Sequence, residues 1–277
     1  MYSNVHNIER MERSKMATIG FIGTGSMGSA LARAAAKSGM WDRILLSNRG
    51  REKAEQLSAE IGGIVTDNAG AAAEADYLLL GVEPSQLAGV IAEIRGTLEA
   101  GDNSAVVVSM AAGVELAALR SYLGEGAAII RIMPNIPAAV GADVILFCAD
   151  RVPELRLEEF LGGMRAAGTF LPMEESRMKA ATGVTGCGPA FTAMFAEALA
   201  DGAVACGVPR AEAKKLAALT VMGSAKMLLD AELDPAGLKD LVCSPGGSTI
   251  QGVRALENGA FRAAVMEAVI ATFEKKF

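Results

Sequence analysis

Short apolar runs alternate with amphipathic patterns along the first half of the chain. Runs rich in Val, Ile and Leu predict strands at 17–22, 43–47, 63–66, 77–82, 105–109, 129–133, 144–147 and 169–171. Helical patterns lie between them, for example at 29–38, 51–61, 86–95 and 154–167. Several strands are apolar throughout, which is typical of parallel strands buried on both faces. The first half therefore predicts an α/β domain built from βαβ units.

Alanine-rich helical patterns dominate from about residue 173 onward, and β-branched runs become rare. The predicted helices lie at 176–182, 189–206, 210–230, 235–242 and 249–277. Small residues such as Ala196, Ala200 and Gly223 allow helices to pack closely. We therefore expect an all-α domain at 173–277 after an α/β domain at 16–172. The polar segment 1–15 is expected to be a flexible N-terminal extension ahead of a natural start at Met16.

A glycine-rich turn connects the first strand to the first helix. Gly23, Gly25 and Gly28 form the pattern Gly-x-Gly-x-x-Gly at this junction. The first glycine permits a tight turn, the second lets the backbone approach a pyrophosphate, and the third lets the helix pack against its strand. The free N–H groups and the dipole of the helix face the phosphates. The pattern in this context predicts a Rossmann-like dinucleotide-binding domain.

The end of the second strand indicates which dinucleotide is bound. An NAD site carries an Asp or Glu near this point, and the carboxylate holds the ribose 2′-hydroxyl. This chain instead has Ser47-Asn48-Arg49, followed by Arg51 and Lys53. A hydroxyl, an amide and a guanidinium suit a 2′-phosphate, so the sequence favours NADP, with NADPH preferred over NADH. The alternative is an ordinary solvated loop.

Composition excludes several classes of function. Hydrophobic residues make up 51% of the 277 residues, yet no uninterrupted apolar run reaches the roughly 18–20 residues of a membrane helix. The apolar excess is expected in subunit interfaces, which predicts a homodimer at least. A net charge of −6 gives no basic surface for nucleic acid. We therefore expect a cytoplasmic protein that acts on a small molecule, with neither nucleic acid nor membrane as a partner.

The histidine and cysteine content limits the chemistry further. The one histidine, His6, lies in the N-terminal extension, so a Ser-His-Asp or Cys-His site and a His-ligated metal are excluded within the folded body. The cysteines form no Cys-x-x-Cys pair, so no zinc or other metal site is expected and the thiols are expected to be reduced. The reaction must use Lys, Tyr, a hydroxyl, a carboxylate or a substrate that is already electrophilic.

Other turns are candidates for ligand binding. The segments 81–84 and 110–113 each follow a strand and should lie at the carboxyl edge of the sheet, where ligands of such folds bind. In the second half, 244–249 reads Ser-Pro-Gly-Gly-Ser-Thr and leads into a helix. Its N–H groups can hold a small carboxylate, while the hydroxyl of Ser248 or Thr249 reaches a second polar atom. The alternative is a helix-breaking turn with Thr249 as the cap.

The order of these motifs resembles the Δ1-pyrroline-5-carboxylate reductase family. The matching segments are GFIGTGSMG, GVEP, SMAAGV, RIMPNIP, TGCGPAF, EALADGAVACGVPR and LKDLVCSPGGSTIQGVRALE, which together span nearly everything after Met16. The resemblance implies NADPH-dependent reduction of a cyclic imine to L-proline, the last step of proline biosynthesis. It also implies a helical dimerisation domain whose dimers are often built up into a decamer. A C=N carbon takes hydride readily, so no dedicated side-chain acid is needed.

The resemblance also implies the site residues. Those that would contact NADP are Ile22, Gly23, Thr24, Gly25, Ser26, Met27, Asn48, Arg49, Asn68, Gly81, Val82, Glu83, Pro84, Met110, Ala111 and Ala112. Those that would bind substrate are Glu175, Gly247, Ser248 and Thr249. Thr249 is the predicted catalytic residue, with its hydroxyl near the imine nitrogen.

Some positions depart from the family pattern and leave two alternatives open. Glu83 replaces a usual lysine, and Cys187 and Phe191 each replace a residue that carries a hydroxyl. These changes motivate a non-catalytic NADP(H)-binding homologue as one alternative. The other is a β-hydroxyacid or imine dehydrogenase of similar architecture. Such enzymes use a Lys followed at i+4 by an Asn, whereas Lys179 is followed by Gly183 here.

Overall fold

The computed structural model describes residues 16–100 and 105–274, so the expected extension 1–15 lies outside the described residues. The contacts divide the chain into two compact units, the first ending at Gly186 and the second beginning at Cys187. The expected boundary at 172/173 differs from this division, because helix α7 (Glu175–Thr185) lies with the first unit. The domain bounds 16–172 and 173–277 stay predictions.

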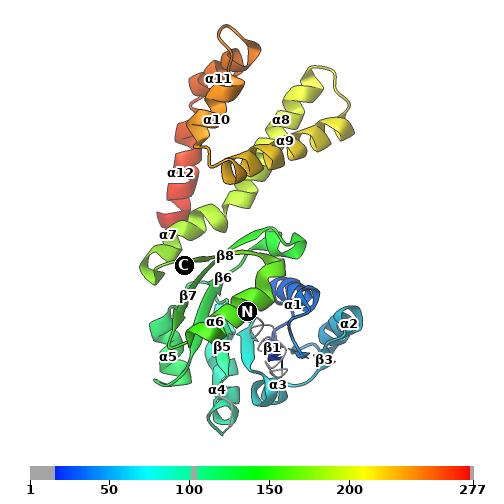
Figure 1. The fold of residues 1–277 in the computed structure, drawn as a ribbon, viewed down its shortest axis with the longest axis vertical. Coiled ribbons are helices and arrows are strands. Elements are labelled where there is room, and N and C mark those ends of the chain that lie inside the picture. The colour runs from blue at the N-terminus through cyan, green and yellow to red at the C-terminus, as the bar shows by residue number, and fades with distance from the viewer. Residues whose placement is uncertain (1–15, 101–104, 275–277) are drawn as a thin grey trace, which may run out of the picture. The chain divides into compact units, whose positions relative to one another are not determined.

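A single eight-stranded sheet forms the centre of the first unit within the described residues, in the order β3-β2-β1-β4-β5-β6-β7-β8 (Figure 1). The strands are β1 (Thr18–Ile22), β2 (Arg43–Ser47), β3 (Ile64–Val65), β4 (Tyr77–Leu80), β5 (Val106–Ser109), β6 (Ile129–Met133), β7 (Asp143–Asp150) and β8 (Gly168–Pro172). Every pair of neighbouring strands within β1 to β6 is parallel. Strand β7 is antiparallel to β6, because their short connection holds only the 3₁₀ turn η1 (Ile136–Val140).

Alternate residues of the strands face opposite sides of the sheet, and each side has its own core. Tyr77 and Leu79 pack with helices α1 (Ser26–Ser38), α2 (Arg51–Ile61) and α6 (Glu154–Met164). Leu78 and Leu80 pack on the other side with α3 (Asn68–Glu74), α4 (Pro84–Ala100) and α5 (Leu116–Leu123). These two layers of helices bury the sheet on both faces, which confirms the predicted Rossmann-like fold of this unit.

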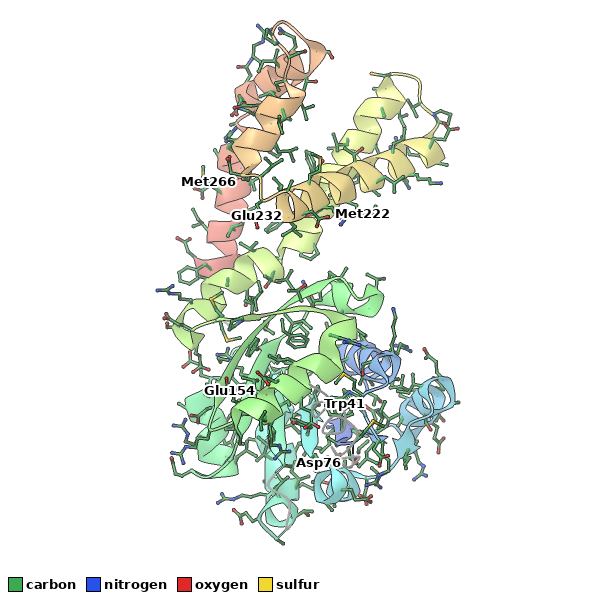
Figure 2. All side chains as sticks on the ribbon, viewed as in Figure 1. Trp41, Asp76, Glu154, Met222, Glu232 and Met266 are labelled. Carbon is green, nitrogen blue, oxygen red and sulfur yellow. The ribbon has the colours of Figure 1, made fainter. Side chains whose placement is uncertain are left out.

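The core on the α1 side contains a cluster of aromatic rings. The ring centroids of Trp41 and Tyr77 lie 5.3 Å apart, and those of Tyr77 and Phe160 lie 5.8 Å apart. Trp41, labelled in Figure 2, donates its indole N–H to the carbonyl of Gly163 at 3.0 Å. Burial raises the pKa of Tyr77, so its hydroxyl stays protonated and donates to the Glu159 carboxylate at 2.6 Å.

The second unit is helical throughout its described part. It contains α8 (Gly188–Ala205), α9 (Arg210–Asp230), α10 (Pro235–Val242), α11 (Ser248–Asn258) and α12 (Phe261–Glu274). Helices α8 and α9 pack through alanines, and Ala200, Ala213 and Ala217 form the small buried cluster there. This confirms the predicted all-α domain. No described helix of the chain is long and apolar enough to cross a membrane.

Two parts of the helix prediction were wrong. The single helix expected at 249–277 is divided into α11 and α12, because Ala260 has a φ of +55° and interrupts the helical backbone. Asn258-Gly259 precedes this break and is an ordinary helix-stop signal. The short helices α3 and α5 were not predicted, since helices of about two turns give little periodicity.

Candidate active site

Three predicted loops meet at the carboxyl edge of the sheet, because β1, β4 and β5 are neighbours there. The N–H of Gly81 after β4 donates to the carbonyl of Ile22 at 2.7 Å. The N–H of Met110 after β5 donates to Leu80 at 3.4 Å. The structure therefore brings the segments 22–27, 81–84 and 110–112 together, as expected for one binding site.

The three glycines of the first loop have three different physical roles. Gly23 has a φ of +97°, and a Cβ there would lie 2.4 Å from the carbonyl oxygen of Gly81. A Cβ on Gly28 would lie 2.0 Å from the carbonyl oxygen of Gly23. A Cβ on Gly25 would meet no described atom within 4 Å. Gly23 and Gly28 are thus required by the packing of the protein itself, whereas Gly25 leaves open space in front of the loop.

The open space at Gly25 fits a pyrophosphate. Gly25 is the N-cap residue of α1, no side chain caps this helix, and no acidic residue lies in its first turn. The first N–H groups of α1 are therefore available to an anion, and the helix dipole favours one. The side-chain hydroxyl of Thr24 is buried and has no hydrogen-bond partner in the described chain. A ligand with phosphate oxygens suits these donors.

The end of β2 holds this loop in place. Asn48 accepts a hydrogen bond from the N–H of Thr24 at 3.0 Å, and its amide donates to Gly50 at 3.0 Å. Arg49 is exposed and makes no hydrogen bond or ion pair within residues 16–100 and 105–274. Asn48 thus supports the glycine-rich loop, and the guanidinium of Arg49 is available to a ligand such as a 2′-phosphate.

Asn68 begins helix α3 and lies beside the end of β2. The hydroxyl of Ser47 donates to its side-chain oxygen at 2.7 Å, and its side-chain nitrogen donates to Glu93 of α4 at 2.9 Å. The sequence predicts Asn68 as a site residue. It indicates Ser47 only as part of the segment Ser47-Asn48-Arg49, and it does not indicate Glu93. The contact between Asn68 and Glu93 joins positions 25 residues apart, so no local pattern signals it.

The loop after β4 passes directly into helix α4. Gly81 and Val82 are half-buried, while Glu83 and Pro84 are exposed. Pro84 is the first residue of α4, and the carbonyl of Glu83 accepts the N–H of Gln86 at 2.9 Å. A carboxylate at this position lies beside the positive end of the helix dipole. The dipole of α4 therefore favours the carboxylate of Glu83.

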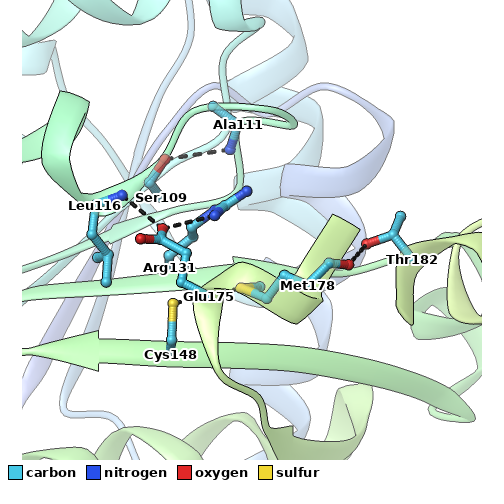
Figure 3. Close-up of polar contacts among 8 residues, drawn as sticks. All are labelled: Ser109, Ala111, Leu116, Arg131, Cys148, Glu175, Met178 and Thr182. Atoms are coloured by element: carbon cyan, nitrogen blue, oxygen red, sulfur yellow. Dashed lines mark hydrogen bonds and ion pairs between the residues drawn. The ribbon is translucent and has the colours of Figure 1, made fainter. Parts of the chain in front are cut away.

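The loop after β5 is held by Glu175 of α7. Figure 3 shows its carboxylate between the backbone N–H of Leu116 and the guanidinium of Arg131. Both donors reach the same oxygen, Oε1, at 2.7 Å. Leu116 begins α5, so the carboxylate caps that helix from another element. The sequence predicts substrate binding for Glu175, and neither Leu116 nor Arg131 was expected as its partner.

A cysteine of low nucleophilicity lies next to this ion pair. Cys148 of β7 has its Sγ 3.5 Å from the sulfur of Met178 on α7 (Figure 3). Burial raises the pKa of the thiol to about 11, with a smaller effect from the charge of Glu175. A thiol protonated at neutral pH is a poor nucleophile.

The predicted substrate loop lies in the second unit. Gly246 has a φ of +72°, and the N–H of Gly247 donates to the carbonyl of Ser244 at 3.0 Å. Gly247 is the N-cap residue of α11, so Ser248 and Thr249 are its first two residues, and both are exposed. The N–H of Gly247 is thus occupied, whereas those of Ser248 and Thr249 lie in the first turn. Thr249 is not the cap of this helix.

Comparison with known proteins gives consistent matches along the chain. Residues 175–276 match the family described as "Pyrroline-5-carboxylate reductase dimerisation". Residues 18–113 match the family described as "NADP oxidoreductase coenzyme F420-dependent". The chain is 42% identical over 270 residues to a pyrroline-5-carboxylate reductase of Methanosarcina acetivorans, covering 96% of this chain and 97% of the relative.

Solved structures give the same result. A pyrroline-5-carboxylate reductase from Coxiella burnetii superposes with a TM-score of 0.86 at 30% identity, covering 93% of this chain and 96% of that one. A pyrroline carboxylate reductase from Plasmodium falciparum with NADP bound superposes with a TM-score of 0.82 at 28% identity, covering 94% and 97%.

Proposed function

Because the chain belongs to the pyrroline-5-carboxylate reductase family, we propose that it reduces Δ1-pyrroline-5-carboxylate to L-proline with NADPH. This is the last step of proline biosynthesis, and the protein is an NADP-dependent oxidoreductase acting on a CH–NH group. The observation that carries the proposal is the match to known relatives over almost the whole chain, 96% of it for the Methanosarcina acetivorans protein. The glycine loop with its open space at Gly25 agrees with it.

The carboxyl edge of the sheet is the proposed cofactor site. The first turn of α1 and the loop around Gly25 would hold the pyrophosphate, and Arg49 would contact the 2′-phosphate. The segments 81–84 and 110–112 would lie on the nicotinamide side. Bound NADPH would supply a hydride from C4 of its nicotinamide.

The start of α11 is the proposed substrate site. The N–H groups of Ser248 and Thr249 would bind the substrate carboxylate, and the hydroxyl of Thr249 would hydrogen-bond the imine nitrogen. Gly247 contributes the turn rather than its N–H, since that group donates to Ser244. Hydride addition to the carbon of the nitrogen-protonated imine would move the C=N π electrons onto nitrogen. The nitrogen already carries the proton of the product amine, so no histidine is needed. Glu175 stays a proposed substrate-binding residue on the family resemblance alone.

The chain carries a dimerisation domain and is therefore expected to form oligomers. We propose a homodimer at least, with the helices of 176–277 in the interface, and a decamer as the larger assembly. We also propose a cytoplasmic location. Neither a nucleic acid nor a membrane is proposed as a partner.

A cofactor-by-substrate assay tests the function. NADPH oxidation is followed with pyrroline-5-carboxylate, and NADP⁺ reduction is followed with a panel of β-hydroxyacids. We expect turnover with the imine and none with the hydroxyacids. Turnover with hydroxyacids alone would favour the dehydrogenase alternative. Tight NADPH binding without any turnover would favour a non-catalytic homologue.

A further inference from the structure

Glu93 lies on α4 and has a contact that the proposed mechanism does not use. Its Oε2 accepts a hydrogen bond from the side-chain nitrogen of Asn68 at 2.9 Å. The side-chain oxygen of Asn68 accepts from the hydroxyl of Ser47 at 2.7 Å. Helices α3 and α4 pack together through the core on their side of the sheet, so the backbones that carry Asn68 and Glu93 are fixed relative to each other.

This contact determines which way the amide of Asn68 points. An amide has a donor end and an acceptor end, whereas an ionised carboxylate can only accept. Glu93 therefore turns the nitrogen of Asn68 toward α4, and the oxygen consequently faces Ser47. The hydroxyl of Ser47 could accept or donate, so Ser47 alone would permit either orientation of the amide. Glu93 is the group in this network that permits only one.

The network lies where the adenosine end of a dinucleotide binds. In Rossmann domains the group at the end of the second strand faces the adenosine ribose. Ser47 is the last residue of β2, and its carbonyl accepts the N–H of Gly23 at 2.8 Å. Asn68 is thus one hydrogen bond away from the strand end that supports the phosphate loop. One N–H of its amide remains after the bond to Glu93 and is available to the ribose or its 2′ substituent.

We propose that Glu93 is a positioning residue for the cofactor, one that orients the amide of Asn68 toward the adenosine ribose. The inference rests on the proposed function, because it takes the carboxyl edge of the sheet as the NADP site. The proposal also predicts whether removing the charge of Glu93 weakens or tightens NADPH binding. If Glu93 acted only as a negative charge near the 2′-phosphate, its removal would tighten NADPH binding, whereas loss of positioning weakens it.

Glu93→Gln tests the proposal, because glutamine keeps the size of the side chain but can donate as well as accept. The dissociation constants of NADPH and NADH are measured by titration calorimetry without substrate. We expect Glu93→Gln to weaken the binding of both about 3- to 10-fold, the loss of about one neutral hydrogen bond. The kcat at saturating NADPH should be unchanged, and Asn68→Ala combined with Glu93→Gln should bind no more weakly than Asn68→Ala alone.

Glu99→Gln is the matched control. Glu99 is an exposed glutamate on the same helix and pairs with Arg95 at 2.7 Å, so its change should leave both dissociation constants as in the wild type. Unchanged or tighter NADPH binding by Glu93→Gln would overturn the proposal. A matching loss in Glu99→Gln would also overturn it, because the effect would then belong to α4 in general. Failure of the wild type to bind NADPH would instead overturn the proposed function.

Discussion

At the residue scale, the role of Thr249 can be tested by removing one hydroxyl. Thr249 is exposed in the first turn of α11 and is not the helix cap, so its loss should leave the helix start intact. Thr249→Val keeps the shape of the side chain and should lower kcat/KM for the imine about 10- to 100-fold, the value of one aligned hydrogen bond. Steady-state kinetics with pyrroline-5-carboxylate measure this.

Thr249→Ser is the control for that change, because it restores the hydroxyl and should retain most of the activity. NADPH affinity should be unaltered in both variants, since the proposed cofactor contacts lie in the first unit. Near-wild-type turnover by Thr249→Val would show that the hydroxyl is not used. Loss of NADPH binding in parallel would indicate a general disturbance of the fold.

Arg49 carries the prediction about cofactor choice. Its guanidinium is exposed and has no partner in the described ranges, so no described residue competes with a 2′-phosphate for it. Wild type should have a lower KM for NADPH than for NADH, and Arg49→Asp should narrow or reverse this preference. A lost charge-assisted contact costs about 1.5–3 kcal/mol with NADPH.

Arg49→Lys keeps the positive charge without the guanidinium fork and should lose less than the aspartate variant. The KM values for NADPH and NADH are measured for the wild type, Arg49→Asp and Arg49→Lys. Equal use of NADPH and NADH by the wild type, together with no response to Arg49→Asp, would contradict the 2′-phosphate assignment.

The role of a single residue could be predicted from sequence where the residues that determine it lie close together in the chain. The spacing indicated Gly23 and Gly28, because the positive φ of Gly23 and the contact of Gly28 with the carbonyl of Gly23 both belong to one turn. The approach of Gly23 to Gly81 depends on the neighbouring strand and was not predicted. The partners of Glu175 were not accessible in this way. Arg131 lies 44 residues before it, and their proximity depends on β6 and α7 being adjacent in the finished fold.

At the scale of elements, Glu175 fixes the start of α5 to β6 and α7. Glu175→Ala removes the acceptor of the Leu116 N–H and leaves Arg131, whose side chain is 11% exposed, without its carboxylate. The expected loss in free energy of unfolding is about 2–4 kcal/mol. Urea unfolding at fixed protein concentration measures it, because the stability of an oligomer depends on concentration.

Glu175→Gln separates this capping role from the predicted substrate contact. Glutamine retains a side-chain oxygen that can accept from Leu116 and Arg131. The loss in free energy of unfolding should therefore be less than half as large in Glu175→Gln as in Glu175→Ala. If Glu175 also contacts substrate, the glutamine variant should have a raised KM for the imine while its fold is kept. Full stability in Glu175→Ala would contradict the capping role.

The features of the elements that the sequence did not predict have separate physical reasons. Helix α3 begins after Asp67, whose carboxylate caps the N–H of Gly70 at 2.7 Å, but the helix itself is short. The antiparallel direction of β7 follows from the length of its connection to β6, which the strand pattern itself does not reveal. The longer patterns of α2 and α9 were predicted with the bounds that the structure has. The short α10 was also predicted with its bounds, and Asp234 and Pro235 mark its start.

At the scale of the whole molecule, the second unit has little core of its own. Within 187–274 only Ala200, Ala213 and Ala217 are buried. Its exposed large apolar side chains are Met194, Leu199, Leu216, Leu219, Met222, Met227, Leu229, Leu241, Val242, Ile250, Leu256, Phe261, Val265, Met266, Ile270 and Phe273. So much exposed apolar surface is typical of an obligate interface, in agreement with the dimerisation match.

Met222 and Met266, labelled in Figure 2, test this interface. They lie on α9 and α12 and are 61% and 59% exposed. A charge at either position would be buried without a partner, so Met222→Glu and Met266→Glu should shift the protein toward monomer and lower its Tm. Light scattering and thermal unfolding measure both effects.

Lys37→Glu, an exposed change on α1 of the first unit, is the control and should leave the oligomer intact. A stable, active monomer of the wild type at micromolar concentration would contradict the proposed obligate dimer. Retention of the oligomer by both methionine variants would place the interface elsewhere on the second unit.

The position of the sheet in the chain bears on how the protein is made. All eight described strands, including the edge strands β3 and β8, precede Met173, and both of their cores belong to the first unit. The first unit can therefore fold on the ribosome while the second is still being synthesised. The second unit, with three buried alanines, would complete its folding only on meeting another chain. Maturation would then be a bimolecular step, so its rate would depend on how fast the cell makes the protein.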